Sequence, residues 1–252
     1  MRSSDLKHDL RLALDPVLWT KENLGLEPDP WQAEVLESGA KRILLNCSRQ
    51  SGKSTITAAL ALHTALYQKG SLVLCLSPTL RQSSELFRNV LRFYGADPGI
   101  PSKAESALRL ELENGSRIVS LPGKEQNVRG MASVTLLIVD EAARVPDDLY
   151  YSVRPMLAVS NGRLIALSTP FGTRGWFYEA WHSSEPWKRW EIPASKCPRI
   201  SKEFLEEEKR ALGSYWFEQE YCCRFLDSNT KVFKREDIGA MFDEEVTGWD
   251  IQ

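Results

Sequence analysis

Short, continuous apolar runs that alternate with segments of helical periodicity constrain the fold of this 252-residue chain more than any other feature. Strands that are apolar at every position, rather than at every second one, are typical of a parallel sheet that helices cover on both faces. The sequence therefore predicts an α/β fold with a mostly parallel sheet flanked by helices. Buried strands are expected at residues 42–47, 71–77, 135–140 and 163–169, with a further candidate at 188–192.

The connections between these strands have helical or turn signals. Helices are predicted over residues 3–24 with a break at Asp15-Pro16, from Asp29-Pro30 onward, over about 52–68, and from the second strand to about Phe93. Asn114-Gly115 separates two short apolar segments, 109–113 and 117–121, and predicts a β-hairpin.

Composition narrows the class of protein. Hydrophobic residues make up 42% of the chain and charged residues 26%, as in a globular protein with a sizeable core. No apolar run approaches the roughly 20 residues of a membrane span, and the first residues lack the apolar stretch of a signal peptide. The net charge of -2 means that nucleic-acid binding would need a local basic patch or a ring of subunits. Five cysteines without a CxxC pair predict reduced thiols in an intracellular compartment, with no structural zinc.

A phosphate-binding loop is predicted between the first strand and the helix that follows it. There, Gly52 lets the backbone approach a phosphate closely, Lys53 reaches the β- and γ-phosphates of ATP, and Ser54 supplies a hydroxyl to Mg²⁺. Cys47 stands where the pattern GxxxxGK[ST] has its first glycine, so a strict pattern match would miss the loop. The residues predicted to bind the nucleotide here are Ser48, Arg49, Gln50, Ser51, Gly52, Lys53, Ser54 and Thr55.

Two adjacent carboxylates end the third buried strand. Asp140 is expected to hold Mg²⁺ through water, together with Ser54, and Glu141 is expected to orient and polarise the attacking water. A fixed carboxylate at this point suits water as the acceptor, so the pair favours a hydrolase over a kinase. The predicted reaction converts ATP and water to ADP and phosphate, with ATP and Mg²⁺ bound.

In their order along the chain, these motifs resemble the ATPase domain of the large terminase subunit of tailed double-stranded DNA bacteriophages. The resemblance covers nearly the whole chain and implies a RecA-like P-loop NTPase core of the ASCE type. Residues 48–54 resemble that family's variant phosphate loop, which tolerates the loss of the first glycine. Asp29-Pro30-Trp31-Gln32 is similar to its adenine-recognising element, which implies that Trp31 and Gln32 contact the base.

Two arginines are candidates for stabilising charge that develops on the γ-phosphate. Arg49 lies inside the phosphate loop and could reach that phosphate in cis. Val128-Arg129-Gly130 resembles the family's Arg-Gly pair, which implies that Arg129 is an arginine finger. Arg129 could reach the γ-phosphate of its own subunit or that of a neighbouring subunit in a ring. It could also be an ordinary surface arginine without a catalytic role. Arg144 follows the two carboxylates and is a candidate for a salt bridge.

Ser168 and Thr169 end a strand that should lie beside the strand of the two carboxylates. Their hydroxyls could hydrogen-bond the water-activating carboxylate and report the state of the γ-phosphate, since ligands bind at this edge of open α/β sheets. A plain strand-end cap is the alternative. Leu167-Ser168-Thr169-Pro170 resembles the coupling motif of the terminase family, which links ATP hydrolysis to movement.

The chain is expected to divide into an ATPase core at 1–200, a small helical lid or linker subdomain at 201–235 and an acidic linker or tail at 236–252. Glu218–Tyr221 and Phe225–Asp227 resemble the lid segment that precedes the nuclease domain of the family. That nuclease needs well over a hundred further residues, so DNA cleavage is not expected of this chain.

The expected function is an ATP-hydrolysing motor domain that moves double-stranded DNA into a viral procapsid, gripping mainly the backbone phosphates. The resemblance implies self-association into a ring on the portal, a small terminase subunit and the portal protein as partners, and action in the host cell cytoplasm and transiently at the procapsid. Two alternatives stay open. A superfamily 2 helicase or translocase would need a second RecA-like domain, which does not fit after residue 201. An ATP-dependent assembly switch would bind ATP without moving DNA.

Overall fold

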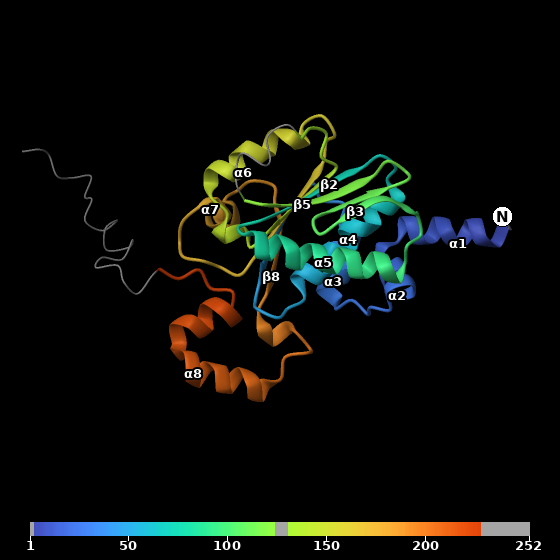
Figure 1. The fold of residues 1–252 in the computed structure, drawn as a ribbon. Helices are drawn as coiled ribbons and strands as arrows, with labels where there is room; N and C mark the ends of the chain where they lie inside the picture. The colour runs from blue at the N-terminus through green and yellow to red at the C-terminus, as the bar shows by residue number, and fades with distance from the viewer. Residues whose placement is uncertain (1–2, 124–130, 228–252) are drawn as a thin grey trace, which may run out of the picture.

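An eight-stranded sheet runs through the protein between two layers of helices (Figure 1). The computed structural model describes residues 3–123 and 131–227. In order across the sheet, the strands are β3 (Ser102–Ser106), β4 (Arg109–Leu112), β5 (Arg117–Pro122), β2 (Leu72–Ser77), β6 (Leu136–Asp140), β7 (Arg163–Ser168), β1 (Arg42–Cys47) and β8 (Lys188–Ile192). All neighbours from β5 to β8 are parallel, which confirms the predicted α/β fold with a mostly parallel sheet.

β3 is the strand that the sequence did not predict. All of its residues are exposed, so no apolar pattern marks it. It pairs with β4 in antiparallel fashion, and β4 pairs with β5 in the same way across the Asn114-Gly115 turn, as the sequence predicted. Gly115 has a φ of +82°, a left-handed conformation that glycine adopts without strain.

Where the sequence predicted a helix, the observed one begins and ends close to the predicted residues, whereas the short helices at 147–153 and 176–182 were not predicted. They are α1 (Ser3–Leu14), α2 (Pro16–Leu24), α3 (Pro30–Glu37), α4 (Lys53–Tyr67), α5 (Leu80–Ala96), α6 (Asp147–Val153), α7 (Trp176–His182) and α8 (Lys202–Tyr221), with short 3₁₀ helices η2 (Ala142–Arg144), η3 (Arg154–Leu157) and η4 (Ala194–Lys196). The break at Asp15-Pro16 separates α1 from α2, because the Asp15 carboxylate accepts a hydrogen bond from the backbone N–H of Leu18 at 2.8 Å and caps the second helix.

Two apolar clusters cover the two faces of the sheet. Successive residues of a strand point to opposite faces, so Ile43 and Leu45 of β1 join one cluster and Leu44 joins the other. Helices α2 to α5 contribute to the first cluster, and α6 and α7 contribute to the second. Burial on both faces explains why the predicted strands are apolar throughout. No helix in the described part of the chain is long and apolar enough to cross a membrane.

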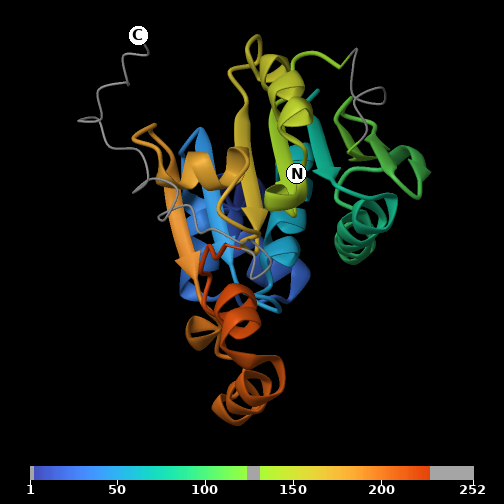
Figure 2. The same ribbon diagram turned by 90° about the vertical axis from the view of Figure 1, so that its left-hand side faces the viewer.

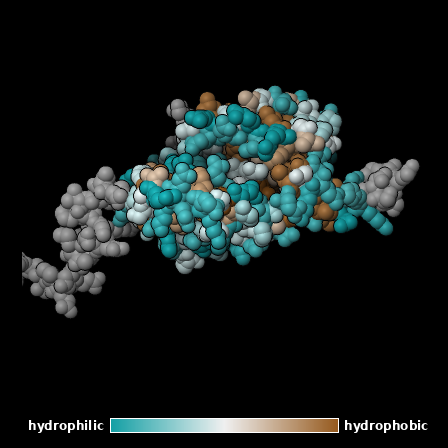
Figure 3. Space-filling view, turned by 90° about the horizontal axis from the view of Figure 1, so that it is seen from below, coloured by the Kyte–Doolittle hydropathy of each residue, from teal (hydrophilic) through white to brown (hydrophobic). Residues whose placement is uncertain are grey.

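Helix α8 lies apart from both layers, beyond the edge at which the parallel strands end (Figures 1 and 2). It bends at Gly213, whose φ of 74° and ψ of 168° are not helical. The residues just after α8 touch the sheet edge, where the Asn46 side chain donates to the carbonyl oxygen of Cys223 at 2.9 Å. Seen from the side of α8, the surface is mostly hydrophilic (Figure 3). The predicted tail at 236–252 and the end of the predicted lid lie outside the described residues.

Candidate active site

The predicted phosphate loop joins β1 to α4 and presents backbone N–H groups at the start of the helix. The first intrahelical bond runs from the N–H of Ile56 to the carbonyl oxygen of Gly52, at 3.2 Å, so the N–H groups of residues 53–55 have no intrahelical acceptor. Gly52 has a φ of +86°, and a Cβ there would lie 2.8 Å from Nε2 of Gln32. A glycine is therefore needed where the loop turns into α4. Free amides at a helix start form a binding site for phosphate.

A cavity of about 460 Å³ lies at this loop. Residues 49–55 line it on one side, and Gln82, Glu141, Arg144 and Thr169 line it on the other. These residues follow β1, β2, β6 and β7, whose carboxyl ends meet at one edge of the sheet. Strand β7 lies between β1 and β6, which separates the loop from the two carboxylates by one strand.

Ser54 and Asp140, the two predicted metal ligands, lie side by side. The Ser54 hydroxyl is 3.4 Å and 3.5 Å from the two carboxylate oxygens of Asp140. Burial raises the pKa of Asp140 to about 6, although the nearby Lys53 lowers it. A hydroxyl and a poorly solvated carboxylate at a phosphate cavity are suitable ligands for Mg²⁺. The described residues contain no cluster of three or more His, Cys, Asp or Glu side chains that could hold a metal ion.

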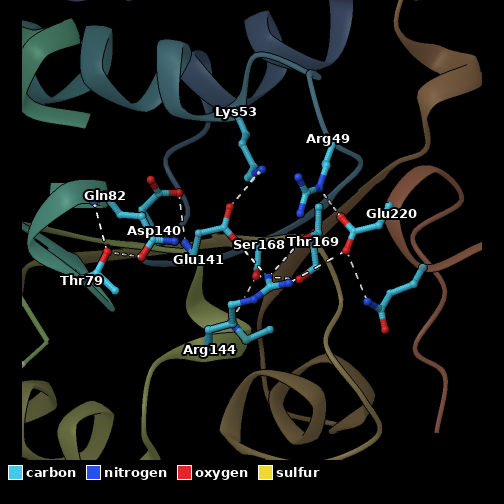
Figure 4. Close-up of polar contacts among 12 residues, drawn as sticks. Arg49, Lys53, Thr79, Gln82, Asp140, Glu141, Arg144, Ser168, Thr169 and Glu220 are labelled. Carbon is cyan, nitrogen blue, oxygen red and sulfur yellow. Dashed lines mark hydrogen bonds and ion pairs between the residues drawn. The ribbon is translucent and has the colours of Figure 1, made fainter. Parts of the chain in front are cut away.

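Glu141 follows β6 and lies between two cations (Figure 4). Its carboxylate oxygens are 3.4 Å from Nζ of Lys53 and 3.0 Å from Nη1 of Arg144. Its backbone is left-handed, with φ 49° and ψ 43°, which is uncommon outside glycine and is found at functional sites. Burial opposes the charge on Lys53, but the carboxylates of Glu141 and Asp140 outweigh burial and raise the pKa of Lys53. Lys53 is therefore a cation at neutral pH.

The Thr169 hydroxyl reaches Glu141 through Arg144, whereas, among the described residues, the Ser168 hydroxyl bonds only backbone groups. The Ser168 hydroxyl accepts from the N–H of Ala143 at 3.2 Å and donates to the carbonyl oxygen of Thr169 at 2.6 Å. Thr169 Oγ1 accepts from Nη1 of Arg144 at 3.3 Å, and the same nitrogen donates to Glu141. Arg144 therefore bridges Thr169 and Glu141 where the sequence predicted a direct hydrogen bond between them. The 3₁₀ turn η2 places the arginine between β7 and the Glu141 carboxylate.

Arg49 is paired with a carboxylate of α8. Its Nε is 2.5 Å from Oε2 of Glu220, and its backbone N–H donates to the carbonyl oxygen of Glu220 at 3.0 Å. The hydrogen bond to Glu220 raises the pKa of Arg49. Arg144 Nη2 lies 3.9 Å from the other oxygen of Glu220. One buried carboxylate thus contacts both arginines at the cavity, and Glu220 is a site residue that the sequence analysis missed. A glutamate within a charged helix carries no signal for this position.

The predicted adenine-recognising residues differ in their surroundings. Trp31 packs in the apolar core and is only 9% exposed, so it does not line the cavity. Gln32 is also buried, and its side-chain oxygen accepts from the N–H of Asp29 at 2.8 Å in a capping box at the start of α3. Its Nε2 faces Gly52, as the short distance above shows. Ser48 is fully buried, and its N–H donates to the carbonyl oxygen of Ile192 in β8.

A second cavity of about 630 Å³ lies on the other side of Gly52. Arg199 lines it and forms a bidentate pair with Asp29, with distances of 2.8 Å and 2.7 Å. Arg199 also donates to the carbonyl oxygen of Ser51 at 3.1 Å, which ties the start of α3 to the phosphate loop. Phe204 of α8 lines the opposite wall of this cavity. The sequence analysis singled out neither Arg199 nor Phe204 as a binding residue.

The segment Val128-Arg129-Gly130, which contains the predicted arginine finger, lies outside the described residues. Even without it, the parallel sheet, the phosphate loop after β1 and the Asp140-Glu141 pair after β6 define the protein as a P-loop NTPase with a RecA-like core. The chain belongs to the terminase large subunit family: residues 44–240 match the family described as terminase large subunit, T4likevirus-type, N-terminal.

Individual relatives agree with this family. The chain is 27% identical to the terminase large subunit of Thermus virus P23-45 over 268 residues, which covers 90% of this chain and 54% of the relative. The solved ATPase domain of the Thermus phage P74-26 large terminase superposes with a TM-score of 0.74 at 25% identity, covering 84% of this chain and all of that domain. The large terminase of a thermophilic bacteriophage in complex with ATP-gamma-S shares the fold, with a TM-score of 0.62 at 14% identity, over 79% of this chain and 53% of that one. The chain spans about half the length of the curated relatives that it matches.

Proposed function

We propose that this chain is an ATP-hydrolysing motor domain that drives double-stranded DNA into a viral procapsid. The observation that carries the proposal is one cavity that Lys53, Ser54 and Glu141 line beside the free amides of the phosphate loop, with Asp140 next to Ser54. These groups have the charges and positions that a triphosphate, its metal and an attacking water require. Membership of the terminase family supports DNA packaging as the work that hydrolysis drives.

The phosphates of ATP would bind the amides of residues 53–55, and Lys53 would move from Glu141 to the β- and γ-phosphate oxygens. Mg²⁺, held by Ser54 and by Asp140 through water, would neutralise phosphate charge. Glu141, released from Lys53, would accept a hydrogen bond from the attacking water and take its proton as the oxygen bonds to the γ-phosphorus. The bond from that phosphorus to the β–γ bridging oxygen would break, leaving ADP and phosphate.

The second cavity is the natural place for the adenine base and the ribose, because it adjoins the phosphate cavity across Gly52. The amide nitrogen of Gln32 would be the part of that side chain available to the base, since its oxygen is bonded to Asp29. The ATP-gamma-S complex of the thermophilic bacteriophage terminase supports a nucleotide as the ligand of this fold.

The remaining parts of the proposal concern partners. Double-stranded DNA would be held mainly by its backbone phosphates, so binding should weaken as salt rises. Subunits would assemble as a ring on the portal, with the small terminase subunit delivering the DNA. This would take place in the host cell cytoplasm and, transiently, at the procapsid. Arg129 would act as a finger on the γ-phosphate of a neighbouring subunit, in which case a single subunit hydrolyses ATP slowly.

The test is the ATPase rate as a function of protein concentration, with and without duplex DNA. A motor with a finger in trans should show a rate per subunit that rises with concentration and responds to DNA. Arg129→Ala should bind ATP normally and lose most of this rise. An assembly switch would bind ATP without a response to DNA, and that result would contradict the proposal. A wild-type rate in Arg129→Ala would remove the finger alone.

A further inference from the structure

One side chain at the phosphate cavity has no role in the proposed reaction. Gln82, in the first turn of α5, lines the cavity opposite the phosphate loop. Helix α5 follows β2, and β2 is the neighbour of β6 in the sheet. Because the carboxyl ends of adjacent parallel strands meet at one edge, Gln82 lies at the same edge of the sheet as Glu141, and both side chains line the cavity (Figure 4).

The Gln82 side chain is oriented by Thr79. The Thr79 hydroxyl donates to Oε1 of Gln82 at 2.8 Å and accepts from the backbone N–H of Gln82 at 3.3 Å. The simplest interpretation is a helix cap, because threonine three residues before glutamine is a common capping pattern. However, Thr79 alone supplies the cap bond, through the backbone N–H of Gln82. The bond to Oε1 adds no backbone partner and fixes the direction of the amide group instead.

Fixing the oxygen leaves the amide nitrogen as a donor. Nε2 of Gln82 donates to no other residue in ranges 3–123 and 131–227, although the side chain is half-buried at the cavity wall. The cations at this cavity approach from other sides: Arg49 and Lys53 from the phosphate loop and Arg144 from η2. A neutral donor on the α5 side would add a contact to a phosphate oxygen that those cations do not reach.

We propose that Gln82 is a positioning residue that donates a hydrogen bond from Nε2 to an oxygen of the γ-phosphate, with its amide held in place by Thr79. The inference rests on the proposed ATPase function of the same cavity. It gives the start of α5 a contact that exists with ATP and is lost with ADP. Bound ATP would thereby contact α5 as well as the elements that carry Lys53 and Glu141.

The test compares the affinities of ATP-gamma-S and ADP, with Mg²⁺ present, for the wild-type chain and Gln82→Ala. Loss of one hydrogen bond to a charged group should weaken ATP-gamma-S binding about tenfold and leave ADP binding unchanged. Gln82→Glu keeps an acceptor for Thr79 and brings a negative charge to the phosphate, so its loss of ATP-gamma-S affinity should be larger. Arg81→Ala, an exposed neighbour in the same helical turn, is the matched control and should bind both nucleotides like the wild type.

The outcomes separate the two proposals. If the wild-type chain binds neither nucleotide, the proposed function fails and the inference with it. If the wild type binds both and Gln82→Ala binds ATP-gamma-S equally well, only the role of Gln82 is overturned. Equal weakening of ATP-gamma-S and ADP in Gln82→Ala would assign the side chain to the capping of α5 and would overturn the role too. Circular dichroism melting of each variant shows whether the fold is kept.

Discussion

The two sides of the nucleotide cavity are built in different ways. On the sheet side, Lys53, Asp140 and Glu141 come directly after strands or begin a helix that follows one, so the packed core fixes their positions. On the α8 side, ion pairs border the two adjoining cavities: Arg49 with Glu220 at the first and Arg199 with Asp29 at the second. Phosphate oxygens can replace a carboxylate as the partner of an arginine, but they do not move side chains that a buried strand holds in place. The comparison leads us to expect that hydrolysis depends on the rigid sheet side, and that the ion pairs of the α8 side rearrange when a nucleotide binds.

The largest effect is expected on the sheet side, from Glu141→Gln. The variant keeps the shape of the side chain but cannot take a proton from water, so hydrolysis should fall by about 10²–10⁴-fold. Nucleotide affinity should change little, because no phosphate contact is removed. Steady-state phosphate release and equilibrium binding of ATP-gamma-S measure the two quantities, and Glu179→Gln, an exposed residue of α7, is the matched control. Retained turnover would reject Glu141 as the base.

Asp140→Asn, also on the sheet side, should change how the free energy of unfolding depends on pH. Burial raises the pKa of Asp140 from 3.8 to about 6 in the folded chain, so the folded state binds more protons than the unfolded state between these values. The free energy of unfolding should therefore fall as pH rises through this window and stay low above it. The variant removes the free-energy cost of burying a charged carboxylate, but Lys53 loses a nearby negative charge. Without metal or nucleotide, we expect a stability gain on the order of 1–2 kcal/mol at pH 8.

Denaturant unfolding at pH 8 and pH 4 checks the Asp140 prediction. The gain should be present at pH 8 and should largely vanish near pH 4, where the carboxyl is protonated in the folded wild type. A variant that is less stable than the wild type at pH 8 would mean that the attraction between Asp140 and the Lys53 charge outweighs the cost of burial.

A smaller effect is expected on the α8 side, from Glu220→Gln. The substitution removes the charge that holds Arg49, so a phosphate no longer competes with a carboxylate for the guanidinium. ATP-gamma-S should bind several-fold more tightly, while the Glu141-dependent chemistry stays intact. Titration calorimetry in low and high salt measures the change, with Glu207→Gln on an exposed part of α8 as the control. Weaker binding would show that Glu220 orders the site rather than restraining Arg49.

The residues on the sheet side of the cavity could be predicted from the sequence, whereas most of those on the α8 side could not, for a physical reason. Apolar runs and the Asp-Glu pair after a strand are local signals, and the packing of the sheet brings their ends together. The bonds of Arg49 with Glu220 and of Arg199 with Asp29 join residues 171 and 170 positions apart. No pattern within either segment specifies such a pair. Trp31 lies in the core, because an aromatic residue at a helix start can pack in the core as well as against a base, and the sequence does not distinguish the two.

The central claim is that the amides of residues 53–55 bind a triphosphate whose metal lies between Ser54 and Asp140. A crystal structure of the chain with ATP-gamma-S and Mg²⁺ tests it most directly. The account predicts β- and γ-phosphates at these amides, Lys53 moved from Glu141 to the phosphates, and the metal within reach of the Ser54 hydroxyl. A nucleotide bound elsewhere, or phosphates at the loop with Lys53 still on Glu141 and no metal at Asp140, would contradict it.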